Sequence, residues 1–144
     1  MLPEAIDLVI VTPTRQLLRA RAVEVSLPGA NGYLGILPGH APLMTELGIG
    51  ELTYRATTEA EPISVTRGFA EILPDRVTVL AETAEMAAEI DIERAEAAKA
   101  RAEKRLASGD TNIDWDRAGV ALQRALIRIQ VARKYRGAPV NSRQ

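Results

Sequence analysis

Hydrophobic and polar residues follow one pattern up to about residue 82 and a different one beyond it. The first part consists of short apolar and β-branched runs, most of them ended by glycine, proline or another turn residue. Such runs, with no helical pattern between them, predict a β-sandwich or barrel rather than a parallel sheet covered by helices. The predicted strands are residues 5–12, 17–27 with a bend or break near Arg21, 33–37, 50–58, 63–66, 68–73 and 76–81.

The second part is rich in Ala, Glu, Arg and Lys and predicts two helices. Asp91 is a suitable N-cap for the first helix, and Gly109 is a natural residue to follow its last turn. After a polar break, Asp114 can cap a second helix that runs from Trp115 to about Lys134. The chain therefore divides into a β domain, a linker, a helical hairpin and a loose tail, at residues 1–84, 85–90, 91–136 and 137–144.

Apolar residues recur every three or four positions along both predicted helices, as they do on a packed helix face. The two stripes are Ala88, Ala95, Ala98, Ala102 and Leu106 in the first helix, and Trp115, Ala118, Leu122, Ala125, Ile129 and Ala132 in the second. Because most of these side chains are small, two antiparallel helices can approach closely but bury little apolar surface. We therefore expect an αα-hairpin that is marginal alone, needs a partner surface and can dock in more than one way.

Composition and charge exclude several classes of function. The 144 residues carry a net charge of −1 and no cysteine, so nothing favours a nucleic-acid or membrane partner, and a disulfide or thiolate site is impossible. No run approaches the roughly 18 apolar residues of a membrane-spanning helix. The apolar stretch 8–11 is too short for the apolar region of a signal peptide. If the protein functions at a membrane, we expect another subunit to hold it there.

Catalytic and metal-binding patterns are absent from the sequence. His40 is the single histidine, and there is no GxSxG, HExxH or phosphate-binding GxxxxGK[ST] stretch. The glycine-rich stretch 28–39 is better explained by turns and close backbone approaches than by a nucleotide loop, because no helical pattern follows it at once. We expect His40 to cap a turn or to pack at a domain surface. The sequence therefore predicts neither an enzyme nor a metal site.

Arginines recur on one face of each predicted helix. The sets are Arg94, Arg101 and Arg105 in the first helix, and Arg117, Arg124 and Arg128 in the second. Every charged residue after Val120 is basic. A solvated helix face with modest ion pairs accounts for such a pattern as readily as a binding surface does.

A resemblance to a known family rests on four stretches that appear in the right order. Residues 27–47 read LPGANGYLGILPGHAPLMTEL, and the core GILPGHAPL at 35–43 is highly specific. The other stretches are VIVTPTRQLL at 9–18, SVTRGFAEILPDRVTVLAE at 64–82 and IDIERAEAAKARAEKRL at 90–106. Together they resemble the epsilon subunit of the bacterial F-type (rotary) ATP synthase, a part of its central stalk. The resemblance implies a β-sandwich of about ten short strands followed by an antiparallel two-helix hairpin.

The same resemblance implies a non-catalytic rotor subunit that couples proton-driven rotation to ATP synthesis. The sandwich would dock on the gamma subunit and the c-ring, and the hairpin would either fold against the sandwich or extend along gamma and block rotation in the hydrolysis direction. The complex would hold the chain at the cytoplasmic face of the bacterial cell membrane. Candidate residues for docking on gamma and the c-ring are Gly32, Gly35, Pro38, His40, Pro42 and Leu43. Candidates for a contact between the extended hairpin and the beta subunit are Arg124, Arg128, Arg133, Lys134 and Arg136.

Some bacterial members of this family bind ATP on the folded hairpin through the pattern I/L-D-x-x-R-A, which stands here at residues 90–95. The resemblance implies ATP as a regulatory ligand, with no cofactor required. Its contacts would be Glu85, Ile90, Asp91, Arg94, Ala95, Arg101, Arg124 and Arg128. Asp91 is also explained as a helix cap, and the arginines also suit the contact to the beta subunit. A free-standing ATP-sensing module outside the synthase is the alternative reading.

Overall fold

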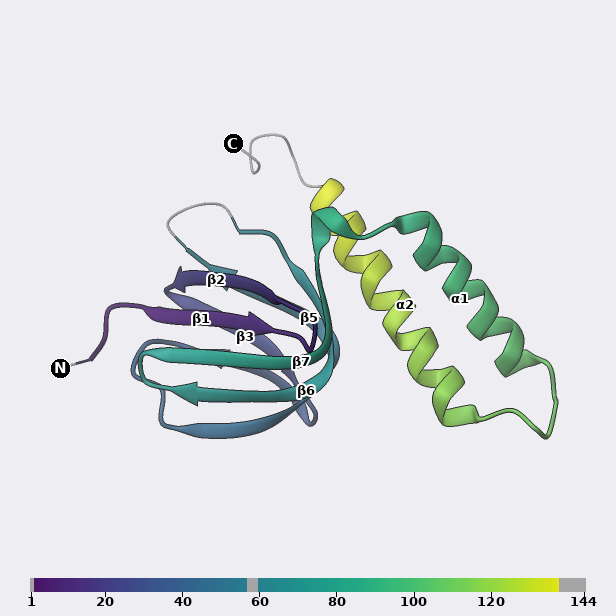
Figure 1. Cartoon of the computed structure of the whole chain (residues 1–144), viewed down its shortest axis with the longest axis horizontal. Helices are drawn as coiled ribbons and strands as arrows, with labels where there is room; N and C mark the ends of the chain where they lie inside the picture. The colour runs from purple at the N-terminus through teal and green to yellow at the C-terminus, as the bar shows by residue number, and fades with distance from the viewer. Residues whose placement is uncertain (1, 57–59, 138–144) are drawn as a thin grey trace.

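The computed structural model describes residues 2–56 and 60–137, which form a β domain followed by a helical hairpin (Figure 1). The strands are β1 (Ile6–Val11), β2 (Gln16–Ala22), β3 (Glu24–Gly29), β4 (Gly32–Ile36), β5 (Leu43–Arg55), β6 (Ile63–Leu73) and β7 (Arg76–Met86). The helices are the short 3₁₀ helix η1 (Ala87–Glu89), α1 (Ile92–Ala107) and α2 (Trp115–Arg136). This arrangement agrees with the predicted fold class.

The seven strands form one hydrogen-bonded sheet in the order β2-β1-β7-β6-β5-β3-β4. Neighbouring strands are antiparallel except for β1 and β7, which pair in parallel. Ala22 of β2 and Ile36 of β4 come from the two ends of this order, yet both belong to one buried cluster. The sheet therefore folds over on itself, so that its apolar faces meet as the two layers of a sandwich.

The sandwich core is aliphatic, as the low aromatic content of the sequence requires. Along β1 the side chains of Ile6, Leu8 and Ile10 are fully buried, and the residues between them are partly exposed. This alternation places every second side chain of a strand in the core. Each such side chain contributes about 1.5–3 kcal/mol through removal from water.

The number of strands differs from the predicted count of about ten. The described residues form seven, because β5 and β6 are each longer than expected. The predicted strand 50–58 begins at Gly50, whereas β5 begins at Leu43 and includes both Gly48 and Gly50. A Cβ atom at Gly50 would lie 2.6 Å from the Tyr33 hydroxyl. The predicted strands 63–66 and 68–73 are one strand, whose register stays constant through Arg67, where the backbone has a φ of +53°. Residues 57–58, which we predicted at the end of a strand, lie outside the described residues.

The helices begin where the predicted caps stand. The Asp91 carboxylate accepts a hydrogen bond of 3.1 Å from the Arg94 backbone N–H, and Asp114 accepts one of 3.0 Å from that of Arg117. Gly109 follows α1 with a φ of +69°, a left-handed conformation that favours glycine. The second helix ends at Arg136, two residues beyond the predicted end. Of the predicted tail, residues 138–144 lie outside the described part of the chain.

Alanines at seven-residue spacing form the seam between the helices. The buried ones are Ala95 and Ala102 on α1, and Ala118, Ala125 and Ala132 on α2. Two residues of the predicted stripes are not in the seam. Trp115 is 50% exposed, because α2 begins at the end of the hairpin that lies away from the sheet (Figure 1). Ala88 is exposed in η1, before the cap of α1.

The second helix lies between α1 and the sheet and contacts β5, β6 and η1 (Figure 1). The two helices are antiparallel, as predicted, and α1 packs chiefly on α2. The β domain and the hairpin therefore meet where α2 contacts the sheet.

Within residues 2–56 and 60–137, no helix combines the length and the apolar character needed to span a bilayer.

Candidate functional site

The sheet presents a row of polar side chains to α2. Glu51 of β5 is paired in register with Ser64 of β6, which is paired in turn with Glu85 of β7. Ile63 and Val65 point into the sandwich core, so Ser64 between them points to the other face, where α2 covers it. Ser64 is 5% exposed and Glu51 is 8% exposed. We call Glu51, Ser64 and Glu85 the acidic row.

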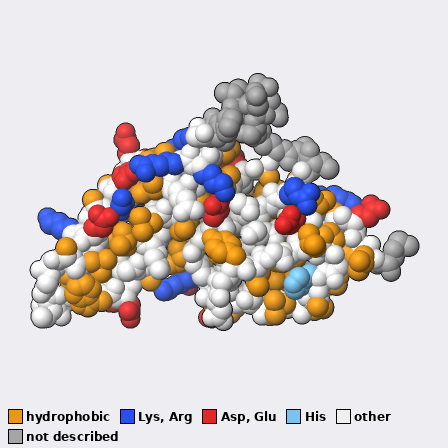
Figure 2. All heavy atoms as spheres, turned by 180° about the vertical axis from the view of Figure 1, so that it is seen from behind, with side chains coloured by type: hydrophobic (Ala, Val, Ile, Leu, Met, Phe, Trp, Pro, Cys, Tyr) orange, Lys and Arg blue, Asp and Glu red, His pale blue; other side chains and the backbone are white. Residues whose placement is uncertain are grey.

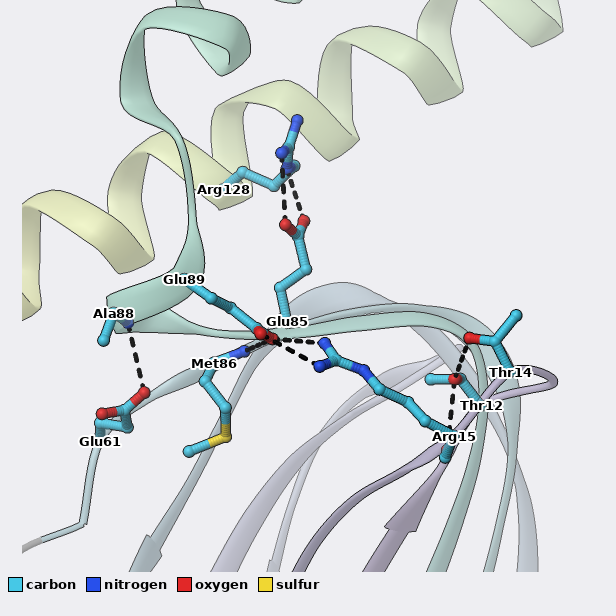
Figure 3. A network of polar contacts seen from close by, with 9 residues as sticks. All are labelled: Thr12, Thr14, Arg15, Glu61, Glu85, Met86, Ala88, Glu89 and Arg128. Carbon is cyan, nitrogen blue, oxygen red and sulfur yellow. Dashed lines mark hydrogen bonds and ion pairs between the residues drawn. The ribbon is translucent and has the colours of Figure 1, made fainter.

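Basic and amide side chains of α2 contact both ends of the acidic row. Arg128 donates to both carboxylate oxygens of Glu85, through Nε at 2.6 Å and Nη2 at 3.3 Å (Figure 3). Lys134 Nζ donates to Glu51 at 2.9 Å, and Gln130 Nε2 donates to its other oxygen at 3.4 Å. These contacts leave no buried side-chain oxygen or nitrogen unpaired within the described part of the chain. The hairpin is thus held on the sheet by charge-assisted hydrogen bonds.

An apolar cluster fixes the C-terminal half of α2 to the linker. Ala87 and Ile90 are buried against Val131 and Ala132 of α2. Beside this cluster, Arg136 donates a hydrogen bond of 2.7 Å to the Ile90 carbonyl oxygen. The cluster is small, so the apolar part of the contact between hairpin and β domain is small as well.

Two carboxylates anchor η1 to the β domain (Figure 3). Arg15, in the turn between β1 and β2, donates two hydrogen bonds to Glu89, at 2.5 and 3.1 Å, and Glu89 also accepts from the Met86 N–H at 2.8 Å. Glu61 accepts a hydrogen bond of 3.2 Å from the Ala88 N–H. The hydrogen bonds from Arg15 lower the pKa of Glu89 below its usual range and raise the pKa of Arg15.

Because the pKa of Glu89 is lowered in the folded chain, the free energy of unfolding changes with pH in the acid range. The stabilisation from its charged form is fully present above the unfolded pKa of about 4.3 and is lost as the pH falls through the folded-state pKa. We expect Glu89→Gln to lower the free energy of unfolding at pH 7 by less than about 1 kcal/mol, because the pair is solvent-screened. Denaturant titrations at pH 7 and pH 3 test this, and a deficit of the variant that persists undiminished at pH 3 would contradict it.

Family comparisons match both parts of the chain. The model described as ATP synthase, Delta/Epsilon chain, beta-sandwich domain covers residues 5–87, and the one described as ATP synthase, Delta/Epsilon chain, long alpha-helix domain covers residues 88–133. The chain belongs to the ATP synthase delta/epsilon family. It is thus an accessory, non-catalytic subunit of the ATP synthase central stalk, as the resemblance predicted.

Individual relatives and solved structures agree with this membership. The chain is 46% identical over 131 residues to the ATP synthase epsilon chain of Syntrophobacter fumaroxidans, covering 91% of this chain and 98% of that one. It is 56% identical over 97 residues to that of Koribacter versatilis, covering 67% and 68%. It shares the fold of a chain in the Euglena gracilis mitochondrial ATP synthase, with a TM-score of 0.75 at 21% identity over 85% of this chain and 78% of that one.

The residues predicted to bind ATP fall into three groups in this delta/epsilon-family chain. Glu85 and Arg128 form the ion pair at one end of the acidic row, and Arg124 lines a hollow of about 380 Å³ next to Glu85. Asp91 caps α1, while Ile90 and Ala95 are buried. The remaining members, Arg94 and Arg101, are exposed on α1, and their guanidinium groups have no hydrogen-bond or ion-pair partner among residues 2–56 and 60–137.

Four of the five residues predicted to contact a beta subunit are engaged within the chain in this docked state. Arg128 and Lys134 contact the acidic row, Arg136 contacts the Ile90 carbonyl, and Arg133 is paired with Glu96 of α1. A contact with any external acidic partner would therefore have to replace these internal partners.

The residues predicted for docking on gamma and the c-ring lie along one edge of the sheet and not in one spot. Gly32 stands at the turn between β3 and β4, whereas Pro38, His40 and Pro42 follow the other end of β4. Gly35 lies between them on β4, and the partly exposed Leu43 begins β5. His40 Nδ1 donates to the Ala41 carbonyl oxygen at 2.6 Å, so the side chain stabilises a turn. Figure 2 shows the single histidine, in pale blue, with hydrophobic side chains around it.

Sequence reasoning missed Glu51, Arg15 and Glu89, which hold the hairpin and the linker in place. The signal for Glu51 was weak, since one charge in a predicted strand normally points to solvent. Its burial depends on α2, which lies about 80 residues further along the chain. No group of His, Asp or Glu side chains suited to a metal ion occurs among the described residues.

Proposed function

We propose that the chain works as a rotor subunit whose β domain docks on the gamma subunit and the c-ring, and whose hairpin restrains ATP hydrolysis when it leaves the sheet. The complex holds it at the cytoplasmic face of the bacterial cell membrane, as a peripheral component. Family membership supports the place in the central stalk. The contact between α2 and the sheet supports the regulatory part.

The observation that carries this proposal is the polar character of that contact. The side chains on the sheet face under α2 are polar, namely Glu51, Ser64, Thr66 and Glu85. The helix donates hydrogen bonds to this face from Arg128, Gln130 and Lys134. Charged and hydroxyl groups regain hydrogen bonds to water when the helix leaves, whereas a large apolar face would not. The hairpin can therefore detach at modest cost, which a two-position regulatory element requires.

The edge that carries the predicted docking residues is also rich in exposed apolar side chains. Tyr33, Leu37 and Met44 are 60%, 57% and 61% exposed. Apolar side chains of this size, exposed along one sheet edge, favour a protein interface over free solvent. We assign the gamma and c-ring contact to this edge, with Gly32, Gly35, Pro38, His40, Pro42 and Leu43 among its residues.

We further propose that ATP is a regulatory ligand of the docked hairpin. Arg124 reaches the hollow beside Glu85, and Arg94 and Arg101 have no partner among the described residues, so their charges are available to phosphate groups. Glu85, Ile90, Asp91, Ala95 and Arg128 are the other proposed contacts. A ligand that needs both helices near the β domain stabilises the docked state by mass action.

The test is hydrolysis by the assembled synthase carrying a shortened chain. A chain that ends at Met86 keeps all of β7 and loses η1 and the hairpin. We expect it to raise the ATP hydrolysis rate about fivefold or more, since the inhibitory position can no longer be populated. A chain that ends at Gly137 keeps both helices and serves as the control, with an unchanged rate.

Equal rates for the two shortened chains would contradict the regulatory proposal. A full-length chain that binds ATP but does not co-purify with the gamma subunit would instead favour the free-standing ATP-sensing module.

A further inference from the structure

Glu51 combines burial with charge in a way that nothing in the proposed docking or ATP contacts explains. Its side chain is only 9% exposed, while that of its partner Lys134 is 60% exposed. A carboxylate removed from water in this way is costly unless it is paired. Among residues 2–56 and 60–137, its carboxylate is paired only by α2, through Lys134 and Gln130. Docking of α2 therefore buries Glu51 and supplies its partners in the same step, and undocking returns the carboxylate to water.

The backbone at Glu51 is fixed by a contact from another strand. The Glu51 N–H donates a hydrogen bond of 3.0 Å to the Tyr33 hydroxyl of β4. Tyr33 reaches β5 because Gly50 has no side chain, since a Cβ atom there would lie 2.6 Å from the hydroxyl oxygen. This bond holds the strand segment that carries the carboxylate independently of the helix. The backbone at Glu51 is thus positioned by the sheet itself and not by α2.

The spacing of the acidic row matches the spacing of the cations on α2. Glu51 and Glu85 are two strand separations apart, which is about 9.6 Å. Lys134 and Arg128 are six positions apart on one helix, which is a rise of about 9 Å. A shift of α2 by one turn, about 5.4 Å, would misplace both pairs at once. The two pairs together therefore define a single docked register.

We propose that Glu51 is the positioning residue that sets how much of the hairpin is docked, by holding Lys134 on the sheet and so withholding the basic face of α2 from an acidic partner protein. The inference rests on the proposed function for its consequence in the synthase, but not for the docking itself. Neutralising Glu51 removes the ion pair with Lys134, which exists only in the docked state, and the undocked state becomes more populated.

The docked fraction can be measured in the isolated full-length chain, which contains no cysteine of its own. Spin labels on cysteines introduced at the exposed positions Asp75 and Ala107 report the distance between the sheet and the far end of α1 by pulsed electron paramagnetic resonance. We expect Glu51→Gln and Lys134→Gln each to raise the ratio of undocked to docked chains on the order of tenfold. The double variant should shift it no further than the larger single change, because both remove one interaction.

Glu71→Gln is the matched control, since Glu71 is an exposed glutamate of the same sheet with no partner among the described residues. It should leave the distance distribution unchanged. If circular dichroism shows that Glu51→Gln disturbs folding, Lys134→Gln tests the same ion pair instead. The Lys134 side chain is mostly exposed, so its replacement should not affect folding. Distance distributions that match the wild type in both folded variants would overturn the inference.

The same variants in the assembled synthase separate this inference from the proposed function. If Glu51→Gln loosens the hairpin in the isolated chain and lowers ATP hydrolysis by the synthase, both stand. If it loosens the hairpin and hydrolysis does not change, the role of Glu51 stands and the regulatory proposal fails. Unchanged docking overturns the role of Glu51 whatever the synthase does.

Discussion

Replacing Gly68 with alanine should destabilise the β domain by about 4 kcal/mol. Gly68 lies within β6, next to Arg67, with a φ of +120°, a conformation that side chains rarely adopt. An added Cβ atom would lie 2.0 Å from the Leu80 carbonyl oxygen of the paired strand β7. The strand pair would have to separate there, at the centre of the sheet. Thermal unfolding followed by circular dichroism should show the midpoint falling on the order of 15 °C.

Gly35→Ala provides the control for that measurement. Gly35 lies in β4 of the same sheet, with no heavy atom within 4 Å of an added Cβ and no left-handed backbone. Its unfolding midpoint should stay within about 2 °C of the wild type, because surface changes of this kind alter stability little. If the two variants unfold at the same temperature, the positive φ and the close approach to β7 at Gly68 do not require glycine.

The second large effect concerns ATP. Calorimetric titration of the isolated chain, with and without Mg²⁺, should detect binding that the Arg94→Ala, Arg124→Ala double variant loses by at least about 100-fold. Each arginine removed takes away charge-assisted hydrogen bonds to phosphate, and the two stand on different helices. If the double variant no longer binds ATP, the ligand contacts both helices and so holds the hairpin in its docked position.

Arg105→Ala, Arg117→Ala is the matched double variant. These arginines also stand on α1 and α2, but they line a separate hollow at the hairpin turn together with Ser108 and Asp114. We expect wild-type ATP affinity for this pair. No heat from the folded wild-type chain at millimolar ATP would contradict the ATP proposal, and the arginines would then be assigned to the contact with a beta subunit. The place of the chain in the central stalk would be unaffected.

The sequence by itself determined the features that depend on residues close together in the chain. Asp91 and Asp114 cap their helices as predicted, because a cap needs only the backbone N–H three residues ahead. The alanine spacing identified the seam between the helices, since helical periodicity alone places Ala95 and Ala102 on one face. The family, too, was identified from continuous stretches, above all residues 35–43.

Only the tertiary structure decided the features that join distant segments. The predicted strand began at Gly50, yet this glycine lies inside β5, where the Tyr33 hydroxyl of another strand occupies the space of a side chain. Glu51 looks like a solvated charge, yet α2 covers it and supplies its partners. Trp115 fits the apolar stripe, but the sheet does not extend to the first turn of α2, and the side chain stays exposed. Burial and pairing of this kind depend on which distant segments contact each other, and local sequence patterns do not predict those contacts.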